Sequence, residues 1–427
     1  MGFGPAFRGI GAWDFNSPFR NSRRVTIRIS TSVLQEKREN RSLTVLLTGA
    51  TGFLGSHIAA EMIRRGIPLW VICRPNQHIT GRERFNRILD WLGVKPRDPS
   101  RVRVLEGFLD RPNLGLNQNQ EGEIRDHVDE IIHCSSNTSF AERRRPEVEK
   151  DNITGLRNLL DWAARSRCYF FHHLSTAYVA GKREGVCREA PVEAGAFTNV
   201  YEESKCRGEQ MVVERCSREG IRWGIYRPSI VYGDSRTGKS LSFRALYYPV
   251  RTVLYFKNLY RTDMLEQNGR RAKEMGVRME ADGTIRLPLR LEVNAEGGIN
   301  LIPIDFFLQA FMAVWEDSPE GGIFHLVNPR PKRIEDLIEY TQRLFRITGI
   351  RAVWGDDFQK TPRNPLEILL ETFLEAYQPY IRDQRVFDCR KTEPILQRRQ
   401  ILCPDFDFEI FSRCMNYAVA AGWGTKI

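Results

Sequence analysis

Leu43-Thr-Val-Leu-Leu-Thr-Gly-Ala-Thr-Gly-Phe-Leu-Gly55 is the stretch that decides the fold. Its first five residues form an apolar run with the length and composition of a buried strand. Three glycines follow at once, and the residues after them have the apolar spacing of a helix that continues to residue 63. The order strand, glycine-rich turn and helix is typical of a dinucleotide-binding turn.

Each glycine of this turn meets a physical requirement. Gly49 can take the tight turn, Gly52 lets the backbone approach phosphates, and Gly55 lets the helix pack close to the strand. The first amides of the helix then face an anion. The predicted cofactor-binding residues are Gly49, Thr51, Gly52, Phe53, Leu54 and Gly55. The alternative is a sheet-to-helix turn that binds nothing.

Further strands are expected at regular intervals, with helical stretches between them. The expected strands are residues 69–73, 102–105, 130–134, 169–174 and 222–227, and a helix is expected over 146–165. Strands that alternate with helices form a parallel sheet with right-handed crossovers. The sequence therefore predicts an α/β fold with a doubly wound parallel sheet of the Rossmann type and a smaller, mainly helical substrate-binding lobe.

The pattern changes twice along the chain. Residues 1–41 show no periodicity and are expected to be a flexible extension. Residues 42–237 would form the dinucleotide-binding domain, with 300–328 returning to it, and 238–299 with 329–427 would form the lobe. The first lobe segment is rich in aromatic residues, which fit either a helix packed on the core or a lid over an apolar substrate. They are Phe243, Tyr247, Tyr248, Tyr255, Phe256 and Tyr260.

The net charge of +11 limits the classes of partner. Five of these charges come from the first 42 residues, so the body is only moderately basic and suits acidic partners. The arginines are scattered and form no recognition motif, which argues against nucleic-acid binding. No apolar run is long enough to cross a bilayer, although peripheral membrane contact stays open.

The nine cysteines indicate the redox environment. They are scattered, without a Cys-x-x-Cys pair or a cluster with histidines at metal spacing, which is typical of reduced thiols and predicts no zinc site. We therefore expect a cytoplasmic protein, with an Arg-rich organellar leader as the alternative.

Arg74 stands at the end of the second expected strand, where this fold meets the adenosine ribose. An acid at this place accepts a hydrogen bond from a free 2′-hydroxyl, whereas an arginine suits a 2′-phosphate. No acid occurs between Pro68 and Arg82. The sequence therefore favours NADPH over NADH, unless Arg74 is simply a solvated residue after a strand.

Two tyrosine–lysine pairs have the spacing of one helical turn. Tyr201 and Lys205 open a periodic helical segment, whereas Tyr178 and Lys182 flank a glycine just past a strand, where a regular helix is not expected. We therefore assign the chemistry to Tyr201 and Lys205.

The chemistry that needs such a pair is the reduction of a carbonyl. Hydride addition leaves an alkoxide, which requires a proton donor with a pKa lowered from about 10, and a nearby ammonium stabilises the phenolate form of Tyr201. Thr176, at the end of the fifth expected strand, can hold the carbonyl oxygen beside Tyr201. Its neighbour Ser175 is the alternative.

These residues resemble those of the extended short-chain dehydrogenase/reductases. Within that superfamily the chain looks most like the thioester-reductase branch, which includes fatty acyl-CoA reductases and the terminal reductase domains of carboxylic acid reductases and peptide synthetases. The resemblance spans about two thirds of the chain. The matching stretches are Gly49–Gly55, Ile131–Cys134, Asn152–Gly155 with Asn158–Leu160, Leu174–Val179, Tyr201 with Lys205, Arg227–Gly238, Asn300–Asp305 and Phe324–Pro329.

The resemblance implies a role for further residues. Thr176, Tyr201 and Lys205 would form the catalytic triad, and Pro228 and Ser229 would lie against the nicotinamide. Asn152 would support a water relay behind Lys205, although it could equally cap a helix or bind backbone.

One segment departs from the family pattern. Where the family has Gly-Asp-Leu and its acid contacts adenine, this chain reads Gly107-Phe-Leu109. Phe108 cannot accept a hydrogen bond, so adenine recognition would rest on stacking or backbone, on Asp110, or on contacts near Leu109, which we count among the cofactor-binding residues.

The leading hypothesis is an NADPH-dependent reductase of a fatty acyl thioester, carried on coenzyme A or an acyl carrier protein, that forms an aldehyde or in a second step an alcohol. The nearest alternatives are a 3-hydroxy or 3-keto lipid or sterol dehydrogenase and a nucleotide-sugar epimerase. Related dehydratases place acids beside the catalytic threonine, and Ser175-Thr-Ala177 contains none. A non-catalytic NADP-binding subunit is the alternative from another class.

Overall fold

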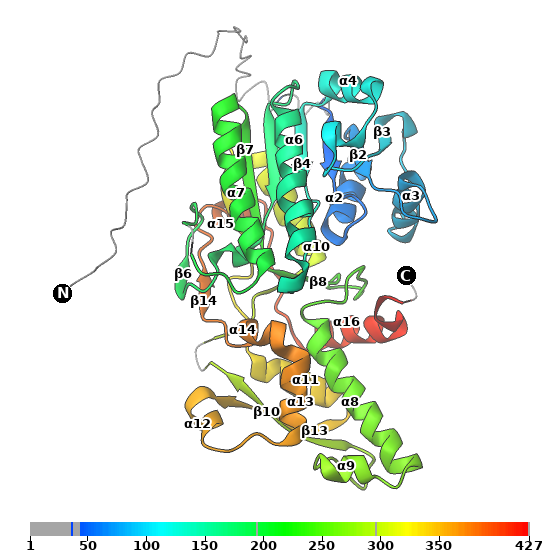
Figure 1. Ribbon diagram of the computed structural model, residues 1–427, viewed down its shortest axis with the longest axis vertical. Coiled ribbons are helices and arrows are strands. Elements are labelled where there is room, and N and C mark those ends of the chain that lie inside the picture. Colours follow the sequence, from blue (N-terminus) through cyan, green and yellow to red (C-terminus); the bar gives the residue numbers. More distant parts are fainter. Residues whose placement is uncertain (1–35, 37–42, 194, 295–296, 426–427) are drawn as a thin grey trace, which may run out of the picture.

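The computed structural model describes Glu36 and residues 43–193, 195–294 and 297–425. The expected flexible extension, residues 1–41, therefore lies outside the described residues apart from Glu36. The described chain forms two bodies stacked along the long axis of the molecule, with the larger sheet in the upper body and the lobe in the lower one (Figure 1).

The upper body is built on a parallel sheet of seven strands in the order β12-β7-β5-β4-β1-β2-β3. This confirms the predicted fold class, and every expected strand is present within about two residues of its expected bounds. The strands are β1 (Val45–Thr48), β2 (Leu69–Cys73), β3 (Val102–Glu106), β4 (Glu130–His133), β5 (Phe170–Leu174), β7 (Arg222–Pro228) and β12 (Gly322–Leu326).

Helices cover both faces of this sheet, because its strands are apolar on both sides. Helices α2 (Phe53–Arg64), α3 (Gly81–Trp91) and α10 (Ile304–Asp317) share one hydrophobic cluster with the sheet. Helices α4 (Gln118–His127), α6 (Gly155–Ala163) and α7 (Val200–Glu219) share the cluster on the other face. Both faces of the sheet are therefore buried, so a ligand can reach it only at the ends of its strands.

The helix expected over residues 146–165 is interrupted. It consists of α5 (Arg145–Glu149), a π-helical turn (Lys150–Thr154) and α6. A π-turn inserts an extra residue into the helix and turns nearby side chains, and such turns occur frequently at functional sites. Here the π-turn contains Asn152, whose side chain is buried.

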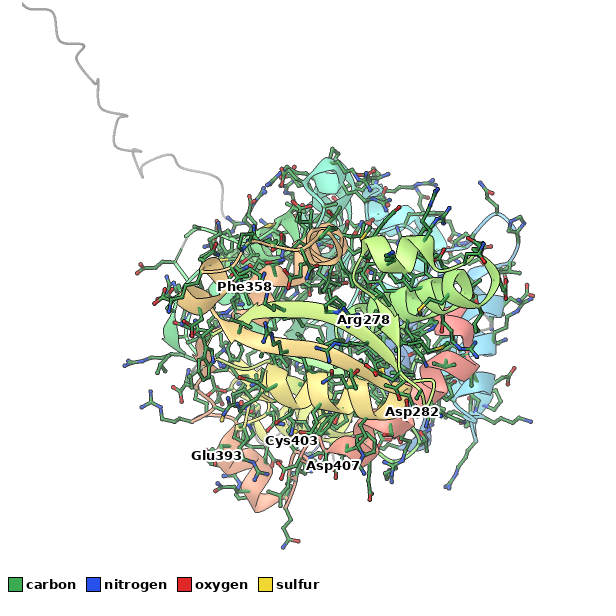
Figure 2. All side chains as sticks on the ribbon, turned by 90° about the horizontal axis from the view of Figure 1, so that it is seen from below. Arg278, Asp282, Phe358, Glu393, Cys403 and Asp407 are labelled. Carbon is green, nitrogen blue, oxygen red and sulfur yellow. The ribbon has the colours of Figure 1, made fainter. Side chains whose placement is uncertain are left out.

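The lower body contains a sheet that the sequence did not lead us to expect. Its strands are β9 (Arg278–Met279), β10 (Ile285–Val293) and β13 (Ile347–Trp354), in the order β13-β10-β9. Seen from below, they run between Phe358 and Asp282 (Figure 2). The helices around this sheet are α8 (Tyr247–Glu266), α9 (Arg270–Glu274), α11 (Ile334–Phe345), α12 (Gly355–Gln359), α13 (Pro365–Leu374), α14 (Gln378–Ile381) and α16 (Phe408–Ala420). Helix α15 (Glu393–Arg398) instead packs against α10 in the upper body (Figure 1).

Two short pairs of strands tie the bodies together. Strand β8 (Ile230–Tyr232) continues from β7 and pairs with β11 (Leu301–Pro303), and β6 (Gly185–Cys187) pairs with β14 (Arg385–Phe387). Both pairs lie beyond the carboxyl ends of the large sheet. In the described part of the chain, no helix combines the length and apolar character needed to cross a membrane.

Candidate active site

A cavity of about 1450 Å³ lies between the carboxyl edge of the large sheet and the lobe. Its walls come from the glycine-rich turn, the ends of β4, β5 and β7, and helices α3, α7, α8, α11 and α13. Pockets for drug-sized ligands are commonly about 300–1000 Å³. The cavity therefore has room for more than one ligand of that size.

The glycine-rich turn lies at the point where the strand order reverses, between β1 and β4. Gly49 has a φ of +76°, and a Cβ there would stand 2.6 Å from the backbone nitrogen of Ser135, beyond β4. A Cβ on Gly55 would overlap the carbonyl of Gly49. Helix α2 has no side-chain cap and no acid in its first turn, so its N-terminus suits an anion.

Most of the predicted cofactor-binding residues of this turn line the cavity. They are Thr51, Gly52, Phe53, Leu54 and Gly55, joined by Pro228 and Ser229 from the end of β7. Gly49 stands behind the turn and shapes it. The hydroxyls of Ser175 and Ser229 are buried without a hydrogen-bond partner among the described residues, so both can bind a polar ligand.

Tyr201, Lys205 and Thr176 all line the cavity. Tyr201 and Lys205 are one turn apart on α7, which Asn199 caps by accepting a hydrogen bond from the amide of Glu202 at 3.0 Å. The hydroxyl of Thr176 donates a hydrogen bond to the carbonyl of Pro228 at 3.5 Å, and Thr176 is near enough to Tyr201 to lower the pKa of its phenol. Ser175, the alternative to Thr176, lines the same cavity.

Lys205 is held at the base of the cavity. Its ammonium donates a hydrogen bond to the carbonyl of Leu174, the last residue of β5, at 2.5 Å. Burial lowers the pKa of Lys205 from 10.5 to about 8, against the opposing effects of Cys134 and Glu209. His133 and His173 stack beneath it at 5.5 Å between ring centroids, and burial together with Lys205 lowers the pKa of both rings.

The expected lowering of the Tyr201 pKa by Lys205 is not found. Burial raises the pKa of Tyr201 above its ordinary value, Cys134 and Glu202 add to this effect, and only the nearby Thr176 opposes it. Loss of solvent from the phenol outweighs the stabilisation of its charged form. The phenol is therefore protonated at neutral pH, as a hydrogen-bond donor must be.

Asn152 lies behind the cavity rather than in its wall. Its side-chain oxygen accepts hydrogen bonds from the Ser136 hydroxyl at 3.2 Å and from the Asn137 amide at 2.7 Å. Its side-chain nitrogen donates to the Asn137 carbonyl at 2.9 Å and to the Ser204 hydroxyl at 2.8 Å. These contacts fix the segment after β4 against α7, which favours the expected alternative of a residue that binds backbone.

Two other predicted cofactor residues lie outside the cavity wall. Arg74 is exposed and forms an ion pair with Asp151 at 3.2 Å. The carbonyl of Leu109 accepts a hydrogen bond from Asn158 at 2.8 Å. The guanidinium of Arg111 stacks over the ring of Phe108, 3.9 Å from the ring centroid. Asp110 forms an ion pair with Lys150 at 2.9 Å.

The charged side chains of the cavity wall are all basic. Among its described residues are six basic side chains and no Asp or Glu, namely Arg84, Arg87, Arg144, Lys205, Arg244 and Arg251. The five arginines were not predicted from the sequence, because they come from three distant regions of the chain, namely α3, the turn before α5 and the segment 244–251. A wall of this kind raises the local concentration of anionic ligands such as phosphates.

The second tyrosine–lysine pair is not arranged as a pair. Tyr178 lies in the wall but is buried against the rings of Tyr380 and Phe387 at 5.1 and 5.5 Å, and Arg385 stacks over it at 4.7 Å. Lys182 is exposed. The aromatic-rich segment is divided in a similar way, since Tyr247, Phe256 and Tyr260 pack in the lobe core while Phe243 and Tyr248 face the cavity.

No group of three or more His, Cys, Asp or Glu side chains that could hold a metal ion occurs among residues that the structure describes. The nine cysteines are all free thiols.

Comparison with known proteins identifies the family. The family model described as "Male sterility protein", an NAD-binding family, matches residues 47–311, which is more than half of the chain. The match covers the glycine-rich turn, most of the large sheet and the three residues Thr176, Tyr201 and Lys205.

The chain also has low sequence identity to curated proteins that are longer than it is. The chain is 25% identical over 395 residues to a linear gramicidin synthase polypeptide of Brevibacillus parabrevis, covering 88% of this chain and 7% of that protein. It is 28% identical over 224 residues to fatty acyl-CoA reductase 2 of Bos taurus, covering 44% of this chain and 43% of that protein. The matches thus span less than half the length of either relative.

Among solved structures, the terminal R domain of the myxalamid PKS-NRPS biosynthetic pathway shares the fold. The TM-score is 0.67 at 24% sequence identity, and the match covers 89% of this chain and 91% of that one. Together with the family match, this similarity confirms the predicted resemblance and the fold class.

Proposed function

Because the chain belongs to the male sterility protein family, an NAD-binding, thioester-reductase branch of the extended short-chain dehydrogenase/reductases, we propose that it is an NADPH-dependent reductase of fatty acyl thioesters. The observation that carries the proposal is the meeting of two hydroxyls and one ammonium, from Thr176, Tyr201 and Lys205, in a cavity whose other charges are arginines. The free thiols support a reducing compartment such as the cytoplasm.

The cavity suits the cofactor on physical grounds. Gly49 and Gly55 have no Cβ, so the chain can turn tightly there and leave room for a pyrophosphate at the start of α2. The hydroxyl of Ser229, which has no hydrogen-bond partner among the described residues, lies in the wall of the same cavity. Gly52, Phe53 and Leu54 would hold the pyrophosphate, and Pro228 and Ser229 the nicotinamide. When bound, the cofactor supplies hydride to the carbonyl carbon of the substrate.

The protein's own side chains stabilise the carbonyl oxygen of the thioester, supply the proton and allow the thiolate to leave. Thr176 and Tyr201 donate hydrogen bonds to the carbonyl oxygen, and these bonds strengthen as negative charge develops there. Lys205 orients the site and offsets that charge. Collapse of the tetrahedral adduct breaks the carbon–sulfur bond, so that one thioester, one hydride and one proton give one aldehyde and one thiol. A second hydride and a proton would convert the aldehyde to an alcohol.

The arginines support a thioester whose thiol carries phosphates. Arg144, Arg244 and Arg251 line the cavity and are exposed. Coenzyme A and the prosthetic arm of an acyl carrier protein both bear phosphate close to the thiol arm, so the same residues suit either carrier. Binding to a carrier protein would add contacts to its acidic surface.

The thioester reaction can be tested with the purified chain. Incubation with NADPH and a long-chain acyl-CoA is expected to release one thiol for each acyl group reduced, measured with a thiol reagent alongside NADPH absorbance. Rapid reduction of a ketone without any thiol release would refute the proposal and favour a lipid or sterol dehydrogenase. Tight NADPH binding without turnover of any carbonyl would favour a non-catalytic subunit.

The preference for NADPH is proposed to depend on Arg84 together with Arg74. Arg84 lines the cavity and donates a hydrogen bond to the Arg74 carbonyl at 2.6 Å, which places its guanidinium beside the end of β2. Charge-assisted hydrogen bonds contribute about 1.5–3 kcal/mol, so Arg84→Ala is expected to lower kcat/KM for NADPH about 10- to 100-fold and to leave that for NADH nearly unchanged.

Arg82→Ala is the matched control for this prediction. Arg82 lies on the same helix, is exposed and does not line the cavity. Its replacement is expected to leave the NADPH-to-NADH ratio of kcat/KM unchanged. Equal losses for both cofactors in Arg84→Ala would show that Arg84 does not read the 2′-phosphate.

A further inference from the structure

Part of the cavity reaches into the hydrophobic core of the lobe. Helix α11 presents Ile334, Leu337, Ile338 and Thr341 to it, which is the i, i+3, i+4, i+7 spacing of a single helical face. The opposing wall comes from α8, β10, β13 and α13, with Val250, Val253, Leu291, Ile350, Leu370 and Leu374. We call this part of the cavity the lobe chamber. Helices α8, α11 and α13 lie around it in the lower body (Figure 1).

The described side chains of the lobe chamber present no free polar group. The single polar one among them is Thr341, whose hydroxyl donates to the carbonyl of Leu337 at 2.7 Å and is thereby satisfied within the helix. All the other side chains named for the chamber are aliphatic. The arginines, the lysine and the hydroxyls that line the cavity belong to other parts of its wall. A ligand in the chamber would therefore meet mainly hydrocarbon.

An opening of this kind inside a core is unusual. Protein interiors are packed as densely as organic crystals, and voids larger than a water molecule are few. Most of the chamber side chains also belong to the lobe's buried hydrophobic cluster, so the space is part of the core itself. Apolar cavities of sufficient size bind apolar ligands rather than water. These facts point to a hydrocarbon ligand.

The chamber has a near end and a far end relative to the triad. The carbonyl of Asn300 accepts a hydrogen bond from the amide of Ile230, next to Ser229, and Ile299 pairs with Lys332 just before α11 begins. Ile334 is therefore at the catalytic end. Thr341 lies seven residues further along α11, about 10 Å away at 1.5 Å per residue. There Ile350 is close by, since its amide donates to Gln342 at 3.0 Å.

We propose that the lobe chamber holds the alkyl tail of the acyl group, and that Thr341 and Ile350 at its far end set the longest chain that fits. This inference rests on the proposed function, since it concerns the tail of that substrate. The tail enters past Ile334 while its carbonyl group stays beside Tyr201. The methylene groups then lie along the aliphatic face of α11, against Leu370 and Leu374.

The proposal predicts how affinity depends on chain length. Straight-chain alcohols of about 4 to 18 carbons, competing with a fluorescent fatty acid, are expected to bind about fourfold more tightly for each added methylene, until the chamber is filled, and to level off beyond that length. The kcat/KM values of saturated acyl-CoAs should level off at a similar tail length. Affinity that is independent of length in both series would overturn the proposal.

A matched pair of variants locates the far end. Thr341→Phe fills it and is expected to shorten the length at which both series level off by several carbons. Thr372→Phe makes the same substitution at an exposed position of α13, where the hydroxyl bonds to the carbonyl of Ile368 in the same way, and should leave the length unchanged. Identical profiles for the two variants would refute the assignment of the far end.

A third variant and the two readouts keep the test decisive. If Thr341→Phe does not fold, Ile350→Ala, which enlarges the far end of the chamber, is expected to lengthen the preferred chain instead, and an unchanged profile would count against the proposal. Length-dependent alcohol binding without thioester turnover would leave the chamber in place and refute the reaction. Thioester reduction that ignores chain length would refute the chamber and leave the reaction in place.

Discussion

Tyr201→Phe is expected to lower kcat by about 10²- to 10⁴-fold while leaving the dissociation constant for NADPH within about twofold. A positioned proton donor contributes rate enhancements of that order. The phenol of Tyr201 is protonated at neutral pH because burial raises its pKa, and it stands near Thr176 in the cavity wall. Phenylalanine keeps the ring and its contact with Phe140 at 6.0 Å but removes the donor.

The control for this experiment is Tyr178, which also lines the cavity and belongs to the other tyrosine–lysine pair. Tyr178→Phe removes a hydroxyl from a ring buried against Tyr380 and Phe387, so it should retain most of the turnover. Stopped-flow measurement of hydride transfer and fluorescence titration of NADPH separate chemistry from binding. If Tyr178→Phe loses the greater part of kcat and Tyr201→Phe does not, the assignment of the two tyrosines must be reversed.

The sequence was sufficient for the features that depend on neighbouring residues. A strand, its glycine-rich turn and the following helix are specified by one short continuous segment, which is why the parallel sheet and the place of the cofactor turn could be predicted. The face that carries Tyr201 and Lys205 follows from helical spacing in the same way. Asn199, which caps their helix, stands only two residues before Tyr201.

The features that the sequence did not yield are those that join distant segments. Arg84, Arg144, Arg244 and Arg251 line one cavity, although α3, the turn before α5 and the segment 244–251 are far apart in the chain. No local pattern marks such a set. Strand β10 did have a signal, since Ile285, Leu287 and Leu289 alternate with less buried residues, but it follows a charged stretch and contains a proline.

The same distinction explains Asn152. Its position in a motif was visible, but its contacts depend on a π-turn that brings it against the segment after β4 and against Ser204 of α7. Hydrogen bonds within this cluster fix the walls on both sides of Lys205. Asn152 thus holds the segment after β4 against α7, the helix that carries Tyr201 and Lys205.

Lys205 gives the second large prediction, because its charge changes within an accessible pH range. Burial lowers its pKa from 10.5 to about 8, so the ammonium form predominates below pH 8 and is lost above it. If the ammonium offsets charge on the reacting oxygen, wild-type kcat/KM is expected to be constant below pH 8. It should then fall about tenfold for each further pH unit. Lys205→Met should be about 10²- to 10³-fold slower at neutral pH and should show no such fall.

The measurement is a pH profile of NADPH oxidation from about pH 6 to 10, with spontaneous thioester hydrolysis subtracted. Lys182→Met removes the lysine of the other tyrosine–lysine pair, which is exposed, and should reproduce the wild-type profile. A wild-type profile that stays flat across the whole range would mean that the ammonium is not required. A fall near pH 8 that persists in Lys205→Met would assign the titration to another group, because the buried lysine would then no longer be there to lose its proton.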